Sequence, residues 1–537
     1  MRTRTTKAVI ALTTTGLSLA GVSQLGAEQP TAGVSAAATA AAAPDAELGA
    51  ALDEILDDPS LKGSMVSLVV RDAETGEALY QRNPNRRLNP ASNAKLFSSS
   101  AALHSLRPDY RFTTEVLARG TGYQSRHALR SDLYLEGGGD PTVLADDYAD
   151  MAAQLADAGI TRVRGNLVTD DSFFDDVPLG VAWSWDDEPY YYSAVTSALT
   201  VAPDTDYDSG SVIVETSPGH RVNAPVRLSL VPKTGVIKLR NRATTGTAGS
   251  DNTISVDRRH ASKVVVISGS MPLDDTTQQD WATVPDPSRY AGDVFRRALK
   301  AEGITVTGSI KPGHTPRTAD VLASHESMTA RRLMTPFLKL SNNMIAEALV
   351  KTMGREESGD GSWDAGLEVE LAYAAALGVD TSTLRLSDGS GLSRFDLVSA
   401  RNVTDLLLAV QDEPWFDTWY DALPIAGNPD RFVGGTLSSR MVGTAAANNL
   451  HGKTGSLTSV TALSGYVTNA DDRDLVFSMI SNNYLSSPRS LEDEVGIALA
   501  SWSEEPGAKA PLMEPSQLRR ASTYGPDDIE CSWVKAC

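Results

Sequence analysis

The pattern of apolar and polar positions changes character twice along the chain, and each change predicts a different kind of structure. The first 112 residues mix strand-like and helical patterns, and a proline at position 90 separates a pair of strands from the helix that follows. The pattern predicts a helix over Glu47–Asp57, paired strands over Met65–Val70 and Glu77–Tyr80, and a helix from at or just before Ser92 to Leu106.

The middle of the chain, from Phe112 to Val306, consists of short strand-like runs separated by Gly, Asp and Pro turns. Helical spacing returns near Met328, with Gly354 placed where the second of these helices should stop. The predicted strands of the middle are Leu133–Leu135, Val163–Val168, Val212–Glu215, Val226–Leu230 and Val264–Ser268. The predicted later elements are helices over Ala330–Ser341, Met344–Met353, Trp363–Leu377 and Val398–Gln411, strands over Val460–Val467 and Leu475–Ile480, and a helix over Val495–Trp502.

These changes predict a strand–helix–strand unit whose two halves are separated by an insertion. We expect residues 44–112 and 318–503 to form one discontinuous domain and residues 113–317 to form a mainly β insertion. Residues 504–537 are rich in Pro, Ser and charge, which is typical of a loosely packed tail.

The N-terminal segment has the pattern of an export signal. Arg2, Arg4 and Lys7 precede a short apolar run and then small residues, so we expect cleavage after Ala27 or within Ala36–Ala43. A membrane anchor is the alternative, but the run is short and threonines interrupt it. Residues 1–43 are therefore expected to be a signal peptide and an alanine-rich leader of a secreted, extracytoplasmic protein.

Charge and cysteine content narrow the classes of function. A formal net charge of −20 disfavours a nucleic-acid partner. It also disfavours a protein that is held on anionic lipid by basic surface patches. The two cysteines, Cys531 and Cys537, lie close together at the end and most simply form one local disulfide in an exported chain. No other cysteine is present, so a cysteine-based zinc site is not available.

Three short motifs in a fixed order carry the candidate chemistry. They are Ser92-Asn93-Ala94-Lys95, Ser341-Asn342-Asn343 and Lys453-Thr454-Gly455. On a helix, positions three apart share a face, so the first motif brings a lysine to a serine hydroxyl. A lysine with an ordinary pKa near 10.4 would be protonated, but burial and a second cation both lower that pKa.

The other two motifs complete a predicted site for acyl transfer through an acyl-serine. We expect Ser341 and Asn343, two apart in a turn, to point to one side and to serve in proton transfer and amide binding. Lys453, Thr454 and Ser456 are expected on an edge strand, where hydroxyls and a cation can bind a substrate carboxylate. The backbone N–H groups of Ser92 and Ser456 would form an oxyanion hole.

Other copies of these short motifs compete with the chosen set. Lys233-Thr234-Gly235 repeats the third motif but falls before the second, and Ser481-Asn482-Asn483 repeats the second on an expected core strand. Gly137-Gly138-Gly139 does not open a dinucleotide-binding helix, so we do not expect a phosphate site there. His451 is expected to be a polar neighbour of Lys453, and no G-x-S-x-G segment supports a Ser-His-Asp triad.

With these motifs the chain resembles class C low-molecular-mass penicillin-binding proteins, the type-4 D-alanyl-D-alanine carboxypeptidase/endopeptidases. The long gap between Ser92 and Ser341, where that family carries inserted domains, supports the resemblance. Four further segments resemble the family: Pro90–Lys95, Gly138–Thr142, Ser387–Arg394 and Leu423–Gly427.

The resemblance implies a fold and an activity. The fold would be of the α+β or α/β class, a β-lactamase/transpeptidase-like domain with an antiparallel sheet flanked by helices. Ser92 would be the acylated nucleophile, Lys95 its general base and Lys453 the carboxylate-binding cation, while Thr454, Gly455 and Ser456 would bind substrate. The substrate would be a peptidoglycan stem peptide ending in D-Ala-D-Ala, β-lactams would acylate the enzyme, and no metal or cofactor is implied.

Two further residues are predicted to bind the stem-peptide side chain. If that side chain is diaminopimelate, its end is a zwitterion that Arg394 and Asp186 could hold as cation and anion. A surface salt bridge is the alternative for Arg394 and a solvated loop residue for Asp186. For the whole chain, the alternatives are a serine β-lactamase and a non-catalytic wall-binding protein.

Overall fold

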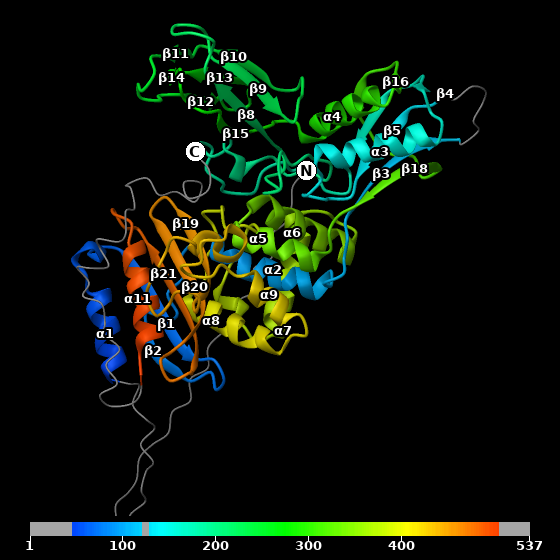
Figure 1. The fold of residues 1–537 in the computed structure, drawn as a ribbon. Helices are drawn as coiled ribbons and strands as arrows, with labels where there is room; N and C mark the ends of the chain where they lie inside the picture. The colour runs from blue at the N-terminus through cyan, green and yellow to red at the C-terminus, as the bar shows by residue number, and fades with distance from the viewer. Residues whose placement is uncertain (1–45, 121–127, 504–537) are drawn as a thin grey trace, which may run out of the picture. The chain divides into compact units, whose positions relative to one another are not determined.

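A five-stranded antiparallel sheet forms the centre of the part of the molecule that carries the motifs (Figure 1). The computed structural model describes residues 46–120 and 128–503. The strand order is β19-β20-β21-β1-β2, so the first strands of the chain pair with the last. The strands are β1 (Met65–Asp72), β2 (Ala78–Arg82), β19 (His451–Leu457), β20 (Val460–Thr468) and β21 (Asp474–Asn482).

Helices cover both faces of this sheet (Figure 1). On one face, α1 (Ala46–Leu56) and α11 (Arg489–Ser501) bury their apolar side chains against the strands. The other face packs on a second core that contains Phe97, Phe337 and Trp419. The helices around that core are α2 (Ala94–Ser105), α5 (Ala330–Lys339), α6 (Asn343–Ser358), α7 (Trp363–Ala376), α8 (Ala400–Ala409) and α9 (Phe416–Ala422), with the short α10 (Arg431–Gly434) nearby.

A separate core lies in the stretch between α2 and α5. Its main sheet has the order β17-β7-β5-β3-β18, and α3 (Ala145–Asp157) and α4 (Pro287–Ala301) contribute buried side chains. The chain enters through β3 (Thr113–Arg119) and leaves through β18 (Ala319–Glu326), which pair antiparallel. The other strands of this stretch are β4 (Ala128–Leu129), β5 (Leu133–Gly137), β6 (Arg162–Val163), β7 (Leu167–Asp170), β8 (Ser211–Ser217), β9 (Arg227–Val231), β10 (Lys238–Asn241), β11 (Thr244–Gly246), β12 (Ser255–Arg258), β13 (Val264–Ser268), β14 (Ser270–Pro272), β15 (Gln278–Thr283), β16 (Thr305–Val306) and β17 (Ile310–Pro312).

The α+β fold with an antiparallel sheet flanked by helices is confirmed, and most predicted elements form. The strand expected over Val163–Val168 is two strands, β6 and β7, in different sheets. The helices α3 and α4 were not predicted. β18 lies in the sheet of the middle stretch, although residues 318–503 were assigned to the discontinuous domain. We keep the domain limits as a proposal.

Gly354 does not end its helix, contrary to the prediction. α6 continues to Ser358 and stops at Gly359, whose φ of 79° is the left-handed conformation that ends many helices. A Cβ at Gly354 would lie 2.7 Å from both the Asp360 carbonyl oxygen and the Gly366 nitrogen. The glycine is therefore needed for the close approach of α7.

Several sequence predictions fall outside the described residues. They concern the signal peptide with its cleavage positions, the tail from residue 504, and the Cys531–Cys537 disulfide. Within residues 46–120 and 128–503, none of the helices combines the length and apolar character that crossing a membrane requires.

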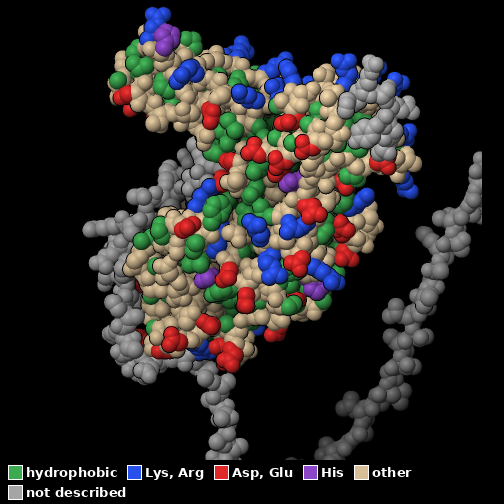
Figure 2. Space-filling view, turned by 45° about the vertical axis from the view of Figure 1, so that its right-hand side comes forward, with side chains coloured by type: hydrophobic (Ala, Val, Ile, Leu, Met, Phe, Trp, Pro, Cys, Tyr) green, Lys and Arg blue, Asp and Glu red, His purple; other side chains and the backbone are tan. Residues whose placement is uncertain are grey.

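On the face shown in Figure 2, side chains of both charges occur, so the net negative charge is not gathered into one acidic patch there.

Asn342 joins the motif region to the middle stretch of the chain. Its Oδ1 accepts a hydrogen bond from the Ile345 N–H and so caps α6. Its Nδ2 donates to the Asp206 carbonyl oxygen at 2.8 Å and to Asp208 Oδ1 at 3.1 Å. The side chain is buried, so all three contacts are shielded from water.

We predict that Asn342→Ala lowers the free energy of unfolding by about 2–3 kcal/mol. The substitution removes the cap of α6 and also the hydrogen bond that Asn342 donates to the buried Asp208 carboxylate. Urea or thermal unfolding measures the change. The matched control is Ser362→Ala, which removes only the cap that accepts from Ala365 N–H, and should cost about 1 kcal/mol. Equal losses in the two variants would show that the contacts to Asp206 and Asp208 add no stability.

Candidate active site

Ser92 lies in a single 3₁₀ turn, Ala91–Asn93, that leads directly into α2. The side chain is 2% exposed. Ala91 has a φ of 45°, in the left-handed region, so the turn is held in an uncommon conformation. Gly391 makes this conformation possible, because a Cβ there would lie 1.9 Å from the Ala91 carbonyl oxygen.

The Lys95 amine lies one helical turn beyond Ser92 and has no exposed surface. Its Nζ donates to Ser92 Oγ at 2.7 Å, to Asn343 Oδ1 at 2.6 Å and to the Ser390 carbonyl oxygen at 2.8 Å. These three acceptors are as many as an ammonium group can use. The amine is therefore fixed against the serine hydroxyl by three separate stretches of chain.

Lys453 makes the corresponding contact on the other side of the second motif. It lies on β19, the edge strand of the central sheet, and has no exposed surface. Its Nζ donates to Ser341 Oγ at 2.7 Å and to the Thr454 carbonyl oxygen at 2.7 Å. Each lysine thus contacts a serine hydroxyl.

The Ser341–Asn343 turn divides its side chains between the two lysines. Ser341 has a φ of 56°, whereas Asn343 is the first residue of α6. The alternation we expected does not describe this turn, because the backbone passes through the left-handed region and then becomes helical. The Asn343 amide also donates from Nδ2 to the Tyr192 carbonyl oxygen at 2.8 Å.

The rest of the third motif shapes the edge of β19. The Thr454 hydroxyl lies 2.8 Å from the Thr436 hydroxyl, and Ser456 Oγ accepts a hydrogen bond from the Arg489 guanidinium. A Cβ at Gly455 would lie 2.6 Å from the Pro90 carbonyl oxygen and 3.1 Å from the Ser92 nitrogen. The glycine therefore allows the strand to lie against the turn that carries Ser92.

A loop over Ser387–Arg394 forms the wall behind Lys95, and buried carboxylates hold it. Asp388 accepts from the backbone N–H groups of Gly391 and Ser393, each at 2.7 Å. Glu347, on α6, accepts from the N–H groups of Gly389 and Ser390. Burial and, to a lesser degree, the charge of Asp388 raise the pKa of Glu347 to about 7.

The two residues predicted for side-chain recognition are both exposed. Arg394 Nη1 donates to the Thr458 carbonyl oxygen at 3.0 Å, next to the end of β19. The Arg394 backbone N–H donates to the Ala182 carbonyl oxygen at 3.3 Å, directly before Trp183. The structure thus brings Arg394 near the aromatic segment that contains Asp186.

The second copies of the two repeated motifs, at Lys233–Gly235 and Ser481–Asn483, make contacts that hold the fold together. Thr234 and Gly235 bind Asp293 of α4 through the Thr234 hydroxyl and the Gly235 N–H. Asn482, at the end of β21, exchanges hydrogen bonds with the backbone of Asn89.

The sequence did not indicate four groups that contact the motif residues. They are the carbonyls of Ser390 and Tyr192, the Thr436 hydroxyl and the Arg489 guanidinium. Only Ser390 lay in a segment that the family resemblance had marked.

Among the described residues, three aspartates approach one another closely enough to hold a metal ion. Asp204, Asp206 and Asp208 have carboxylate oxygens within 4.8 Å of one another. Asp206 pairs with Arg431, Asp208 accepts from Asn342, and Asp204 accepts from the Trp281 indole. These partners account for the group without an ion.

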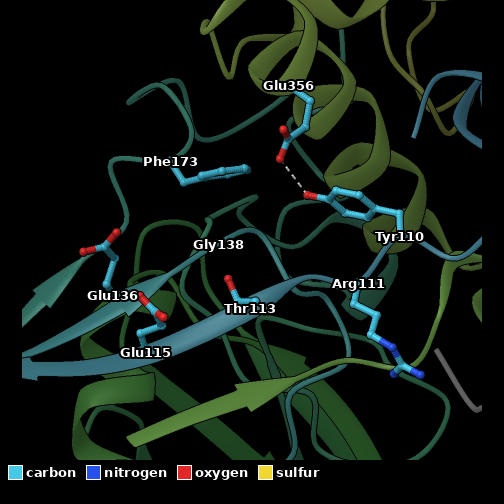
Figure 3. A pocket seen from close by; sticks show the side chains of 8 residues that line it. All are labelled: Tyr110, Arg111, Thr113, Glu115, Glu136, Gly138, Phe173 and Glu356. Carbon is cyan, nitrogen blue, oxygen red and sulfur yellow. Dashed lines mark hydrogen bonds between the residues drawn. The ribbon is translucent and has the colours of Figure 1, made fainter. Parts of the chain in front are cut away.

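A pocket apart from the three motifs lies where β3 and β5 meet α6 (Figure 3). Glu115 and Glu136 form a cross-strand pair in it, and Glu356 accepts from the Tyr110 hydroxyl at 2.9 Å. Burial, with a contribution from Glu136, raises the pKa of Glu115. None of the predicted site residues lines this pocket, whose walls are Tyr110, Arg111, Thr113, Glu115, Glu136, Gly138, Phe173 and Glu356.

Comparison with known proteins gives consistent matches over nearly the whole chain. The model of the D-Ala-D-Ala carboxypeptidase 3 (S13) family matches residues 48–504. A D-alanyl-D-alanine carboxypeptidase of Actinomadura sp. (strain R39) is 43% identical over 495 residues, which cover 91% of this chain and 90% of the relative. The D-alanyl-D-alanine carboxypeptidase DacB of Haemophilus influenzae is 24% identical over 428 residues, covering 79% and 86% of the two chains.

The fold has a clear counterpart among solved structures. Penicillin-binding protein 4 (dacB) from Haemophilus influenzae superposes with a TM-score of 0.72 at 22% identity, covering 84% of this chain and 99% of that one. The same protein complexed with a β-lactam gives a TM-score of 0.66 at 21% identity, covering 83% of this chain and 98% of that one. At these identities the likeness shows a shared fold.

The buried carboxyl of Glu370, on α7 behind the loop wall, generates a prediction about pH. Burial, reinforced by Asp388 and Glu347, raises the pKa of Glu370 well above its usual range. Above about pH 4.3 the unfolded chain loses this proton while the folded chain keeps it, so stability falls as pH rises, by up to about 1.4 kcal/mol per unit. We predict that Glu370→Gln flattens this decline between about pH 5 and pH 8.

Urea unfolding at several pH values measures the slope. Glu368→Gln is the matched control, because Glu368 lies on the same helix and is exposed, and it should leave the slope of the wild type unchanged. The account of Glu370 is wrong if its variant and the wild type lose stability with pH at the same rate.

Proposed function

The chain belongs to the D-Ala-D-Ala carboxypeptidase 3 (S13) family, and from that premise we propose that it removes the terminal D-alanine of peptidoglycan stem peptides through an acyl-enzyme on Ser92. The family makes it a serine-type D-Ala-D-Ala carboxypeptidase. This activity implies a peptidoglycan substrate that ends in D-Ala-D-Ala. We further propose that the leader directs export to the cell-wall side and that β-lactams acylate the same serine.

Acylation would begin at the contact between Lys95 and Ser92. As a neutral amine, Lys95 takes the hydroxyl proton while Ser92 Oγ attacks the carbonyl carbon of the penultimate D-alanine. The neutral amine would keep its two hydrogens on Asn343 Oδ1 and Ser390 O, which leaves its lone pair for the Ser92 hydroxyl. The acceptors Asn343 Oδ1 and Ser390 O then stabilise the ammonium that forms.

The oxyanion and the leaving group need separate partners. We propose that the N–H groups of Ser92 and Ser456 hold the developing oxyanion between the nucleophile turn and β19. When the C–N bond breaks, the leaving D-alanine takes its proton from the Ser341 hydroxyl, which Lys453 replenishes across their 2.7 Å contact. Water then attacks the ester carbonyl and gives a proton to Ser341, whose own proton returns to Lys453, while the Lys95 ammonium reprotonates Ser92 Oγ as the ester bond breaks and the shortened peptide leaves.

The substrate would lie along the open edge of β19. An edge strand can accept a peptide as an added strand, which brings the scissile carbonyl to Ser92. The free terminal carboxylate would then face Lys453 and the hydroxyls of Thr454 and Ser456. The observation that carries the proposal is the pair of buried lysine–serine contacts, Lys95–Ser92 and Lys453–Ser341, each 2.7 Å long.

We predict that benzylpenicillin forms a long-lived adduct on the wild-type protein and none on Ser92→Ala, because only the serine hydroxyl can open the lactam ring. Intact-mass spectrometry over time measures the adduct. Ser105→Ala, at the far end of α2, is the matched control and should be acylated like the wild type. Rapid loss of the adduct with drug hydrolysis would indicate a β-lactamase, and an adduct that persists on Ser92→Ala would exclude this serine as the nucleophile.

We also propose that Arg394 and Asp186 bind the side chain of the stem peptide. Both are exposed, and Arg394 is fixed beside the end of β19 by its bond to the Thr458 carbonyl. A diaminopimelate side chain offers one carboxylate and one ammonium, which these two residues would complement.

Arg394→Ala should lower kcat/KM roughly tenfold for a diaminopimelate peptide, because it removes a charge-assisted pair. The same variant should leave a lysine-containing peptide, which lacks the side-chain carboxylate, within about twofold. Steady-state kinetics on the two peptides measure this difference. Equal losses on both peptides would contradict a role in side-chain recognition.

A further inference from the structure

Arg489 lies at the start of α11 and contacts Ser456, the residue that follows the third motif, although no sequence motif contains Arg489. Its Nη2 donates to Ser456 Oγ at 2.5 Å. Ser456 is 6% exposed and Arg489 is partly buried. A guanidinium group has only donors, so the serine hydroxyl must be the acceptor in this contact. Its own hydrogen is then directed to another acceptor.

The pairing of β19 with β20 shows on which face this contact lies. Ser456 is opposite Thr461, and the Thr461 hydroxyl donates to Glu492 of α11 at 2.8 Å. The side chains of Ser456 and Thr461 therefore share the face that α11 covers. Because side chains alternate along a strand, Thr454 shares this face, whereas Lys453 and Gly455 point to the opposite face.

The strand edge consequently presents two kinds of carboxylate-binding group from its two faces. Lys453 approaches from the side of Ser341, and the hydroxyls of Thr454 and Ser456 approach from the side of α11. A donor that itself accepts from a cation is polarised and becomes a stronger donor. Arg489 thus prepares the Ser456 hydroxyl to donate to an anion at this edge.

A buried charge network holds Arg489 in position. Arg440 pairs with Glu492 at 3.0 Å and with Asp493 at 2.7 Å, and it also donates to the Arg489 carbonyl oxygen at 3.3 Å. Arg440 therefore compensates the carboxylates of Glu492 and Asp493 near the start of α11. The Arg489 guanidinium is directed to Ser456 by a backbone that this network fixes.

We propose that Arg489 is a positioning residue that sets specificity for the free C-terminal carboxylate of the substrate by making Ser456 a donor to it. This inference rests on the proposed function, since it assumes that peptides bind along β19. A substrate whose leaving residue carries no free carboxylate has nothing at this place to accept from the Ser456 hydroxyl. Arg489 therefore favours substrates that keep this carboxylate over substrates in which it is blocked.

The test compares two acylating agents that differ only in the carboxylate: benzylpenicillin and its methyl ester. Intact-mass spectrometry gives the acylation rate of each. We expect Arg489→Ala to slow acylation by the acid about tenfold or more and by the ester less than about twofold, because only the acid uses the charge-assisted donor. Arg489→Lys, which keeps the charge but not the fork, should lie between. Arg401→Ala, a surface arginine on α8, is the matched control and should match the wild type with both agents.

A double-mutant cycle tests whether the effect passes through Ser456. Ser456→Ala keeps the backbone N–H, and the Arg489→Ala/Ser456→Ala variant should be no slower with the acid than the slower single variant. Equal slowing of acid and ester would indicate a structural role and overturn the inference. So would an unchanged acid rate, or additive effects in the cycle. Failure of the wild-type protein to form any adduct would instead contradict the proposed function.

Discussion

A lysine amine that is removed from water needs an acceptor for each of its hydrogens, and for Lys95 these acceptors come from three distant parts of the chain. Ser92 lies on the same turn, Asn343 begins α6, and Ser390 lies in the loop wall. An unmatched amine in this place would cost several kcal/mol. The three stretches must therefore meet at one point, and much of the surrounding structure can be understood from this requirement.

Each segment of chain that meets at Lys95 is held in place by its own contacts. Gly391 and Gly455 let the loop wall and β19 approach the turn that carries Ser92 without a clash. The carboxylates of Asp388 and Glu347 hold the loop that supplies the Ser390 carbonyl. Lys453 repeats the arrangement from β19 with Ser341 as its partner. Asn342 binds the Ser341–Asn343 turn, which lies between the two lysines, to the middle stretch of the chain. This middle stretch therefore contributes to the geometry around the site, although it contains none of the three motifs.

Local patterns predicted what depends on local chemistry. The helix after Ser92, the edge strand with Lys453 and the pairing of β1 with β2 follow from spacing and turn residues that the sequence displays. The sequence misled where packing decides: Gly354 is a close contact rather than a helix end, and the turn at Ser341 depends on a left-handed backbone that alternation does not foresee. The spacing of Tyr148, Met151, Ala152 and Leu155 did contain the signal for α3, but short strand-like runs on either side obscured it. The contact of Arg489 with Ser456 had no signal in the sequence, because it depends on where α11 meets β19.

The central claim is that the chain removes one D-alanine from the end of a stem peptide through Ser92. The most direct measurement is the D-alanine released from a synthetic pentapeptide ending in D-Ala-D-Ala, followed together with the mass of the remaining peptide. The account predicts one D-alanine and one tetrapeptide per substrate with the wild-type protein, and neither product with Ser92→Ala. Release by Ser92→Ala at the wild-type rate, or cleavage at a different bond, would contradict it.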